Sequence, residues 1–485
     1  MLEFEQARWA SRLFTRTAAL PNREKGEPMT PTTAPARGEE ADTLAALAVS
    51  AATVDGGALS DVELAAWLEE RRHTQPQRVR RVPFAELDGW RFERDSGDLR
   101  HASGRFFAVH GLRVRSDFGP VTAWDQPIID QPEIGILGIA VRDFGGIPHL
   151  LMQAKSEPGN VNGMQLSPTV QATKSNYLRV HGGSAVAYLD CFRSPEPGAV
   201  VADVLQSEQG SWFLGKRNRN MIVRVGPQVE AGEDFAWLTL RQVNMLLRQD
   251  NVVNMDARTV LSCLPDWRAD AAAVTGSLHS DTEVRSWITR RRAEHEVSVT
   301  PIGLAQTEGW RRDPDTVSRA DGRHFSVVAV DVVSGRREVA AWSQPLVEPH
   351  GTGIAALFVR RIEGVPHVLL RARAEAGFLS VVELGPTVQC TVENYTHLPR
   401  ESWPPYLDEL LDRRDKAVYD VLLSEEGGRF LAAQSHYVIV EAEDETPLES
   451  EEFRWVSLRQ VDELLRYSHH MNVQARTLIA ALRSL

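Results

Sequence analysis

The stretch LSPTVQATKSNY at residues 166–177 returns as LGPTVQCTVENY at residues 384–395, and this repetition decides how the chain is organised. Two ordered copies of about 200 residues predict two related domains rather than an array of short repeats. Further segments match in the same order: FAWLTLRQVNMLL (235–247) with FRWVSLRQVDELL (453–465), and SEQGSWFL (207–214) with SEEGGRFL (424–431). We place an N-terminal arm at 1–59, a first module at 60–268 and a second at 280–485.

Each copy carries signals for both helices and strands. Ser60-Asp61-Val62-Glu63 and Ser280-Asp281-Thr282-Glu283 have the pattern of capping boxes that open a helix. Segments rich in β-branched and aromatic residues, bounded by Gly or Pro, predict strands. These segments are FFAVHGLRV (106–114), GILGIAVR (135–142), HLLMQAK (149–155) and MIVRV (221–225). Strands come in runs with helices at the domain ends, so we predict an α+β fold for each module. Residues 22–42, rich in Pro, Thr and Glu, should be a flexible arm.

Composition narrows the function. The chain has 485 residues and a net charge of −12, which argues against nucleic acid as a partner. Its three cysteines are widely spaced and no run of apolar residues suits a membrane span or a secretory signal, so we expect a soluble cytoplasmic protein. We find neither a glycine-rich dinucleotide motif nor a P-loop, and no metal-ligand spacing. We therefore predict no cofactor and no metal.

The strand HLLMQAK carries the first candidate site. Alternation places His149, Gln153 and Lys155 on one face and Leu150, Met152 and Ala154 on the other. In the second copy the polar face keeps a histidine but replaces Gln153 and Lys155 with Arg371 and Arg373. A pocket for a negatively charged group explains both copies, and a reaction that requires lysine is confined to the first. A solvated sheet face is the alternative.

The loop after this strand differs between the copies. Ser156, Glu157 and Asn160 become Ala374, Glu375 and Phe378, so two polar groups are lost from the second copy. This difference indicates that the second site has decayed, and ordinary loop variation is the alternative.

Other polar and aromatic residues are candidates for contact with a substrate. A structural role competes with the functional one for each: core packing for the aromatic residues, a solvated turn or a helix cap for the basic ones. Lys216, Arg217 and Arg219 form a short basic cluster that is absent from the second copy. The candidates are Trp124, Thr169, Gln171, Lys174, Asn176, Tyr177, Arg219 and Arg258.

At GRFFAVHGLRV, HLLMQAKSEPGN, QLSPTVQATKSNY and SEQGSWF the chain resembles the NDP-hexose 2,3-dehydratases of antibiotic deoxysugar pathways. The resemblance extends from about residue 60 to the C-terminus. It implies a homodimer in which each half has a Nudix-like fold and the first half is catalytic. It also implies a dTDP-4-keto-6-deoxyglucose substrate, a 3,4-diketo-2,6-dideoxyhexose nucleotide product and a partner ketoreductase. The helix at 240–248 has no carboxylate, so we do not expect diphosphate hydrolysis.

The implied reaction needs a base for the C3 proton, a partner for the C4 oxyanion and an acid for the C2 hydroxyl. We assign the base and acid to His149 and Glu157, and the oxyanion to Lys155 with Tyr177 in reserve. A non-catalytic sugar-nucleotide-binding protein that partners a ketoreductase is the alternative function.

Overall fold

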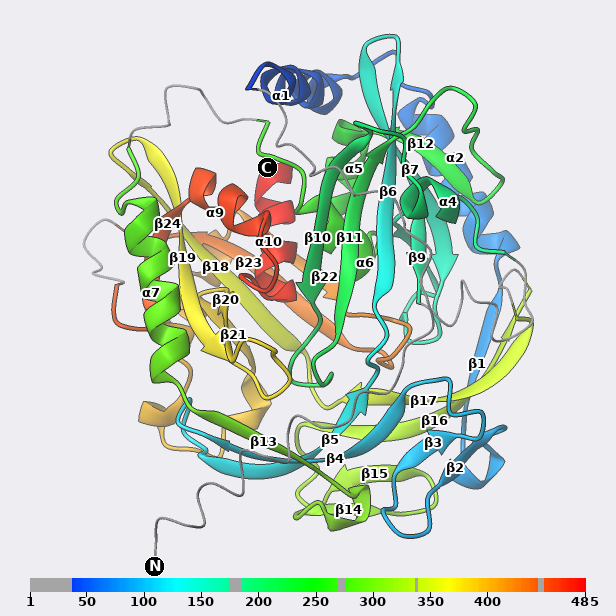
Figure 1. Cartoon of the computed structure of the whole chain (residues 1–485), viewed down its shortest axis with the longest axis vertical. Coiled ribbons are helices and arrows are strands. Elements are labelled where there is room, and N and C mark those ends of the chain that lie inside the picture. Colours follow the sequence, from blue (N-terminus) through cyan, green and yellow to red (C-terminus); the bar gives the residue numbers. More distant parts are fainter. Residues whose placement is uncertain (1–36, 174–184, 268–275, 336–338, 444–448) are drawn as a thin grey trace, which may run out of the picture. The chain divides into compact units, whose positions relative to one another are not determined.

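The computed structural model describes residues 37–173, 185–267, 276–335, 339–443 and 449–485, and the two repeats share one succession of elements (Figure 1). The described residues from 42 to 485 form one compact unit. Of the arm expected at 22–42, residues 22–36 lie outside the described residues. Residues 37–42 belong to the first part of helix α1 (Arg37–Ala52).

Each repeat contains a seven-stranded sheet with the same topology. The order is β10-β11-β6-β7-β12 in the first and β22-β23-β18-β19-β20 in the second. In the first sheet β8 also pairs with β7 and β9 with β6, and in the second β21 pairs with β18 and β24 with β19. One pair in each sheet is parallel, β6 with β11 and β18 with β23, and the other pairs are antiparallel. The strands of the first sheet are β6 (Gly135–Phe144), β7 (Ile147–Ser156), β8 (Met164–Ser167), β9 (Val170–Ala172), β10 (Val200–Ser207), β11 (Arg217–Arg224) and β12 (Phe235–Thr239). Those of the second are β18 (Gly353–Ile362), β19 (Val365–Ala374), β20 (Val382–Gly385), β21 (Val388–Thr391), β22 (Tyr419–Ser424), β23 (Gln434–Glu441) and β24 (Phe453–Ser457).

The helices begin where the sequence places their caps. Ser60 and Ser280 form the predicted capping boxes of α2 and α7, which confirms both helix starts. The helices are α2 (Asp61–Thr74), α4 (Leu189–Arg193), α5 (Leu240–Leu247), α6 (Met255–Leu261), α7 (Asp281–Glu294), α8 (Leu407–Arg413), α9 (Leu458–Leu465) and α10 (Val473–Ser484). Short 3₁₀ helices are η2 (Phe84–Glu86), η4 (Leu304–Gln306), η5 (Val392–Asn394), η6 (Arg400–Ser402) and η7 (Arg414–Lys416). The expected combination of strands and helices in two tandem repeats is therefore present.

Strand β7 alternates as predicted, but both of its faces are covered. Leu150, Met152 and Ala154 join the core that α2, α5 and α6 complete. On the opposite face Leu151 packs in a second cluster with Phe192 of α4. The alternative of a solvated sheet face is therefore wrong.

Each repeat donates its first strand to a small sheet of the other repeat. Strand β1 (Gln77–Val82), from the first repeat, pairs along its whole length with β16 (Phe325–Ser334) of the second. Strand β13 (Val297–Ile302), from the second, pairs with β4 (Ala108–Ser116) of the first. In Figure 1 the blue β1 lies beside the yellow-green β16, and the green β13 beside the cyan β4. The remaining strands of the small sheets are β2 (Trp90–Phe92), β3 (Leu99–His101), β5 (Ala123–Asp130), β14 (Trp310–Arg312), β15 (Thr316–Arg319) and β17 (Ala341–Pro349).

Two glycines allow loops of the two repeats to cross at close range. The Gly159 N–H donates to the Gly427 carbonyl at 2.7 Å, and the Gly377 N–H donates to the Gly210 carbonyl at 2.8 Å. A Cβ atom at Gly159 would lie 1.7 Å from the carbonyl oxygen of Phe430. Only glycine fits this crossing, since a backbone carbonyl cannot move aside as a flexible side chain can.

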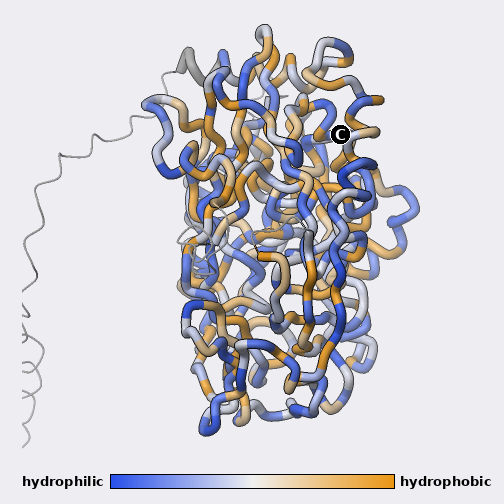
Figure 2. The backbone as a smooth tube through the Cα atoms, turned by 90° about the vertical axis from the view of Figure 1, so that its right-hand side faces the viewer, coloured by the Kyte–Doolittle hydropathy of each residue, from blue (hydrophilic) through white to orange (hydrophobic). Residues whose placement is uncertain are grey.

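No helix in the described part of the chain is long and apolar enough to cross a membrane. Figure 2 agrees, because hydrophobic and hydrophilic residues follow one another at short intervals along the coloured backbone. The apolar stretches are about as long as one strand, which suits the packing of sheets against helices in two layers.

We predict that Gly159→Ala destabilises the protein by about 2–4 kcal/mol, because the new methyl group overlaps a carbonyl of the other repeat. Gly335→Ala is the control, since a Cβ atom there would meet nothing within 4 Å. Chemical denaturation of the two variants and the unchanged chain measures the difference. Equal stability of Gly159→Ala and the unchanged chain would contradict the crossing described here.

Candidate active site

A cavity of about 490 Å³ lies where the first large sheet meets the small sheets, and both repeats contribute its walls. From the first repeat come the end of β7, strand β9 and the start of β11. From the second repeat come the start of β17 and the loop after β22. The polar and aromatic residues that line it include Trp90, His101, Arg105, Phe106, Phe107, Gln131, Lys155, Glu157, Gln171, Glu208, Lys216, Asn218, Asp256, Trp342, Glu426 and Arg429.

One part of the cavity wall is aromatic. The rings of Trp90 and Phe107 have centroids 4.8 Å apart, and those of His101 and Phe106 are 4.4 Å apart. The Trp90 indole N–H donates to the Ser343 carbonyl at 3.0 Å, which ties this wall to the second repeat. The Arg429 guanidinium lies over the Phe107 ring at 4.4 Å. Flat rings beside a cation suit the stacking of a planar ligand group.

Besides Asp88, four carboxyl groups line the cavity, and three of these four come from the first repeat. Glu157 accepts a hydrogen bond from the Gln171 amide at 2.7 Å, and Glu208 accepts one from Asn218 at 2.7 Å. Glu426, from the second repeat, accepts the Gly428 N–H at 3.1 Å. The fourth is Asp256, at the start of α6. Within the described residues, one oxygen each of Glu208, Asp256 and Glu426 is buried without a hydrogen-bond partner.

Burial and the charges of neighbouring acids favour the protonated forms of Glu208, Asp256 and Glu426. Burial raises the pKa of Asp256 well above its usual range, and the charges of Glu208, Glu426 and Glu157 raise it further. Burial raises the pKa of Glu426 to about 8, and raises that of Glu208. Burial lowers the pKa of Lys216 to about 8. A cavity of this kind contains carboxylic acids at neutral pH and can donate protons.

The equivalent positions of the second repeat have different chemistry. Asp256 corresponds to Gln474, Glu426 to Gln209, and Lys216 to Ala433. Lys155 corresponds to Arg373, which forms a buried ion pair with Glu375 at 2.7 Å. The scaffold is duplicated, but two acids and two lysines belong to one copy of the site only.

The structure brings some of the predicted site residues together here. Lys155, Glu157 and Gln171 line the large cavity, and the Lys155 ammonium donates to the Gln171 carbonyl at 3.3 Å. A smaller cavity of about 50 Å³ shares Lys155 and Gln171 with the large one. Its wall also includes the predicted residues Gln153, Ser156 and Thr169.

Thr169 and Ser156 bond to the main chain. The Thr169 hydroxyl accepts the Ala140 N–H at 2.9 Å and donates to the Leu151 carbonyl, and Thr387 makes the same bonds in the second repeat. The Ser156 hydroxyl donates to the Gln75 carbonyl at 3.3 Å. These contacts fix the backbone around the site.

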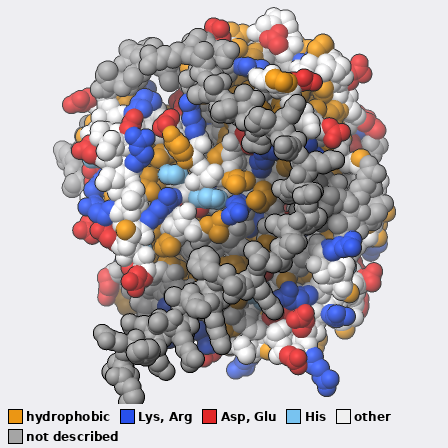
Figure 3. All heavy atoms as spheres, viewed as in Figure 1, with side chains coloured by type: hydrophobic (Ala, Val, Ile, Leu, Met, Phe, Trp, Pro, Cys, Tyr) orange, Lys and Arg blue, Asp and Glu red, His pale blue; other side chains and the backbone are white. Residues whose placement is uncertain are grey.

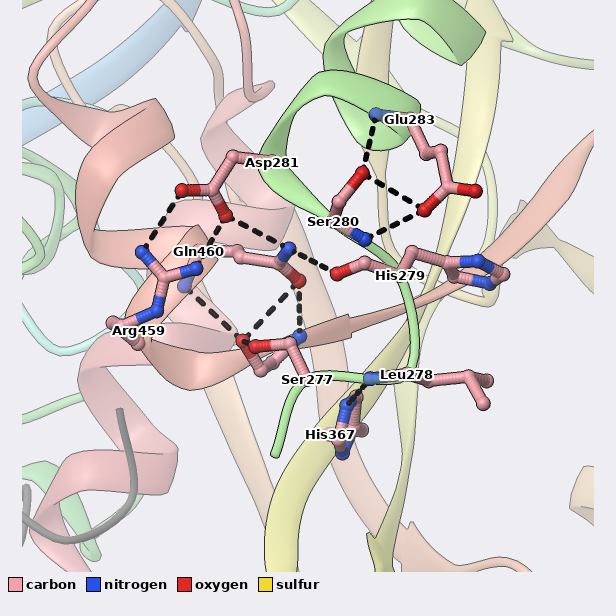
Figure 4. Close-up of polar contacts among 10 residues, drawn as sticks. Ser277, Leu278, His279, Ser280, Asp281, Glu283, His367, Arg459 and Gln460 are labelled. Carbon is pink, nitrogen blue, oxygen red and sulfur yellow. Dashed lines mark hydrogen bonds and ion pairs between the residues drawn. The ribbon is translucent and has the colours of Figure 1, made fainter. Parts of the chain in front are cut away.

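His149 lies away from both of these cavities. Its Nδ1 bonds to the Ile147 carbonyl at 2.8 Å, and its Nε2 to the Ala58 N–H at 3.0 Å. Burial lowers its pKa, so the ring stays neutral and ties the segment before α2 to the sheet. Figure 4 shows the same arrangement in the second repeat, where His367 receives the Leu278 N–H. A histidine with both nitrogens bonded to the main chain in both repeats is structural, and we remove it from the catalytic set.

Four other candidates also have structural surroundings: Trp124, Arg219, Arg258 and Asn160. The Trp124 indole donates to Gln126 at 2.7 Å and packs in an apolar cluster, while its repeat equivalent Trp342 lines the large cavity. Arg219 forms an ion pair with Asp203 on the outer side of β11, whereas the neighbouring Lys216 lines the cavity.

Arg258 is fully buried and donates to main-chain carbonyls, including that of Ser424 at 2.6 Å. Asn160 lies in the loop that crosses Gly427 and donates to the Gly163 carbonyl at 3.0 Å. Lys174, Asn176 and Tyr177 lie outside the described residues.

The sequence-based reasoning missed Glu208, Asp256 and Glu426. The sequence contains a signal for Asp256 and Glu426. When the two repeats are aligned, each of these acids matches an amide residue within a segment that is otherwise similar. Asp256 faces Gln474 in NMDART against NVQART, and Glu426 faces Gln209 in SEEGGRFL against SEQGSWFL. A loss of charge within a retained segment marks a function that one copy does not need.

Basic side chains on the described surface do not gather into a stripe on the face drawn in Figure 3. Lysine and arginine side chains are interspersed there with aspartate and glutamate.

Comparison with known proteins places the chain in a family of sugar-nucleotide dehydratases. The family model of the NDP-hexose 2,3-dehydratases matches residues 61–264 and again residues 281–482. The chain therefore belongs to the NDP-hexose 2,3-dehydratase family.

Three similar proteins have the name dTDP-4-dehydro-6-deoxy-alpha-D-glucopyranose 2,3-dehydratase. The protein of Amycolatopsis orientalis is 47% identical over 444 residues, which cover 90% of this chain and 93% of that protein. The protein of Saccharopolyspora spinosa is 46% identical, with 90% and 94% covered. The protein of Streptomyces violaceoruber is 46% identical, with 87% and 96% covered.

We predict that Glu426→Gln stabilises the protein at neutral pH. The folded-state pKa of Glu426 is raised from 4.5 to about 8, so the folded protein holds a proton that the unfolded chain releases in this range. Stability of the unchanged chain therefore falls as pH rises from about 5 to 8. The amide of the variant has no proton to lose, and its advantage reaches roughly 2 kcal/mol near pH 8, discounted for solvent in the cavity.

Thermal unfolding at a series of pH values measures this advantage. Glu401→Gln, at an exposed glutamate, is the control and should give no pH-dependent gain. A gap between Glu426→Gln and the unchanged chain that stays constant from pH 5 to 8 would show that Glu426 is not held protonated.

Proposed function

We propose that this protein is a dTDP-4-dehydro-6-deoxyglucose 2,3-dehydratase. The observation that carries the proposal is the 46–47% identity, over about nine-tenths of the chain, to three proteins with that name. The product would be a 3,4-diketo-2,6-dideoxyhexose nucleotide. The cavity supports the proposal because it offers groups for each part of such a substrate.

The cavity suits a sugar nucleotide in its size and in the succession of aromatic, basic and acidic residues along its wall. Its volume of about 490 Å³ falls within the range of sites for small ligands. We infer that the aromatic wall around Trp90 and Phe106 stacks on thymine. Arg105, Lys216 and Arg429 supply positive charge for the diphosphate. The hexose then lies among Lys155 and the carboxyl groups.

The reaction begins with removal of the C3 proton, which the C4 ketone acidifies. Glu157 is our candidate base, since the Gln171 amide holds its carboxyl group at the cavity wall. Negative charge then develops on the C4 oxygen, and Lys155 is our candidate partner for it because an ammonium group stabilises an oxyanion. Loss of the C2 hydroxyl as water gives the enol of the 3-ketone, which tautomerises to the product.

We predict that Lys155→Ala lowers turnover by about 100-fold or more while dTDP still binds, because one oxyanion partner is lost. Mass spectrometry of the substrate, with a ketoreductase present to trap the product, measures the loss of one water. Calorimetry measures dTDP binding. Full activity of Lys155→Ala would remove this residue from the mechanism.

The matched control is Arg373→Lys at the equivalent position of the second repeat. It keeps the charge that faces Glu375, and we expect turnover to stay unchanged. The same assay separates the dehydratase from a non-catalytic sugar-nucleotide-binding protein, since the latter binds dTDP but releases no water.

The resemblance extends the proposal to fold, assembly and location. We propose that each repeat has a Nudix-like fold, a view compatible with its mixed sheet and flanking helices. We further propose a cytoplasmic homodimer that passes its product to a ketoreductase, since a 3,4-diketone is reactive. Light scattering after gel filtration should give twice the mass of one chain, and a single-chain mass would contradict the dimer.

A further inference from the structure

Two carboxyl groups from different repeats approach each other at Gly428. A Cβ atom at Gly428 would lie 2.5 Å from Oε1 of Glu426 and 3.6 Å from Oε1 of Glu157. Because glycine stands there, the space between the two groups stays open. Both carboxyl groups line the large cavity, so a ligand in it meets a Glu157 from the first repeat and a Glu426 from the second.

The two groups differ in their hydrogen bonds. Glu157 accepts the Gln171 amide N–H through Oε1, the oxygen that faces Gly428. Glu426 has one oxygen, Oε2, that is buried without a hydrogen-bond partner. Asp256 of α6 lines the same cavity with an unpartnered Oδ1. Two buried carboxyl oxygens without a donor are stable when the groups carry protons, and this arrangement suits proton donation.

We propose that Glu426, supplied by the second repeat, is the acid that protonates the departing C2 hydroxyl in the cavity of the first repeat. Asp256 acts as a positioning residue, because it lines the same cavity and the charge of an ionised Glu426 opposes its own ionisation. This inference rests on the proposed function and deepens it. It means that the reaction needs side chains from both repeats, although only one cavity performs it.

The proton balance of the step closes without a further reagent. The base takes the C3 proton, and the electrons of the C3–H bond move to the C4 oxygen. They then return to form the C2–C3 double bond as the C2–O bond breaks, and Glu426 gives its proton to the leaving hydroxyl, which departs as water. During tautomerisation C2 takes the proton held by the base, and the enol O–H returns its proton to Glu426.

The second copy of the site supports this assignment because it lacks the acid. Glu426 corresponds to Gln209, whose amide donates to Glu425 at 3.1 Å. Asp256 corresponds to Gln474, and Gly428 to Ser211. Glu157 and its glutamine persist as Glu375 and Gln389, also joined by a hydrogen bond. The two copies therefore share the candidate base and differ in the candidate acid.

The test is Glu426→Gln in the full chain, assayed in heavy water with dTDP-4-dehydro-6-deoxyglucose. We expect water loss to slow by about 10²–10⁴-fold, the usual contribution of a positioned acid, while deuterium still enters C3 within several-fold of the unchanged rate. Asp256→Asn should slow water loss less than Glu426→Gln does, and it should leave the rate of deuterium entry at C3 unchanged. Glu425→Gln, outside the proposed machinery, is the matched control and should keep both rates.

The pH profile gives a second readout. Burial raises the pKa of Glu426 to about 8. The positive charge of Arg429 opposes this rise, and the negative charges of Glu157 and Glu208 increase it. The rate of water loss should fall as pH rises above about 8, because the acid loses its proton, and Glu426→Gln should lack this descending limb. Other charged groups that interact with Glu426 are Asp256 and Lys216.

The outcomes are distinguishable. If the unchanged enzyme releases no water, the proposed function is wrong. If it does, and Glu426→Gln keeps its rate of water loss or loses exchange and water loss equally, Glu426 is not the acid. A folded Glu426→Asp variant with partial recovery of water loss and of the descending limb supports the assignment, and one with neither overturns it.

Discussion

Two buried arginines join the repeats, and the position of the cavity depends on them. Arg258, in the last turn of α6, donates to the Ser424 carbonyl of the second repeat at 2.6 Å. Arg476 at the start of α10 donates to the Ser207 carbonyl of the first repeat at 2.6 Å. Both side chains are fully buried. A buried guanidinium is costly unless acceptors surround it, so each repeat completes the core of the other.

The loops that follow Ser207 and Ser424 supply residues to the cavity and to its counterpart. Because Arg258 holds Ser424, the next residues Glu425 and Glu426 are held in place near the first repeat. The exchange of β1 and β13 between the small sheets also holds the two repeats together. One cavity with walls from both repeats is the consequence, and neither repeat alone would contain the full set of side chains.

The duplicated scaffold explains how the two copies of the site diverged. Residues that hold the backbone are the same in both, such as His149 with His367 and Thr169 with Thr387. Residues that face the cavity are not, because amides replace two of its acids. Unpartnered acids in a buried cavity reduce stability, so the two acids present in one copy alone agree with the catalytic role proposed for that copy.

The amino-acid sequence by itself determined the duplication, the helix caps at Ser60 and Ser280 and the alternation of β7, because these are local patterns of period and capping chemistry. It also located Lys155 and Glu157 at the end of a strand. The exchange of first strands was decided only in the tertiary structure. Strands of the two repeats have similar patterns, so a pattern cannot tell β4 from β16 as the partner of β1. The addition of Glu426 to the first repeat's cavity, and the engagement of both His149 nitrogens by the main chain, follow from that same packing of distant segments.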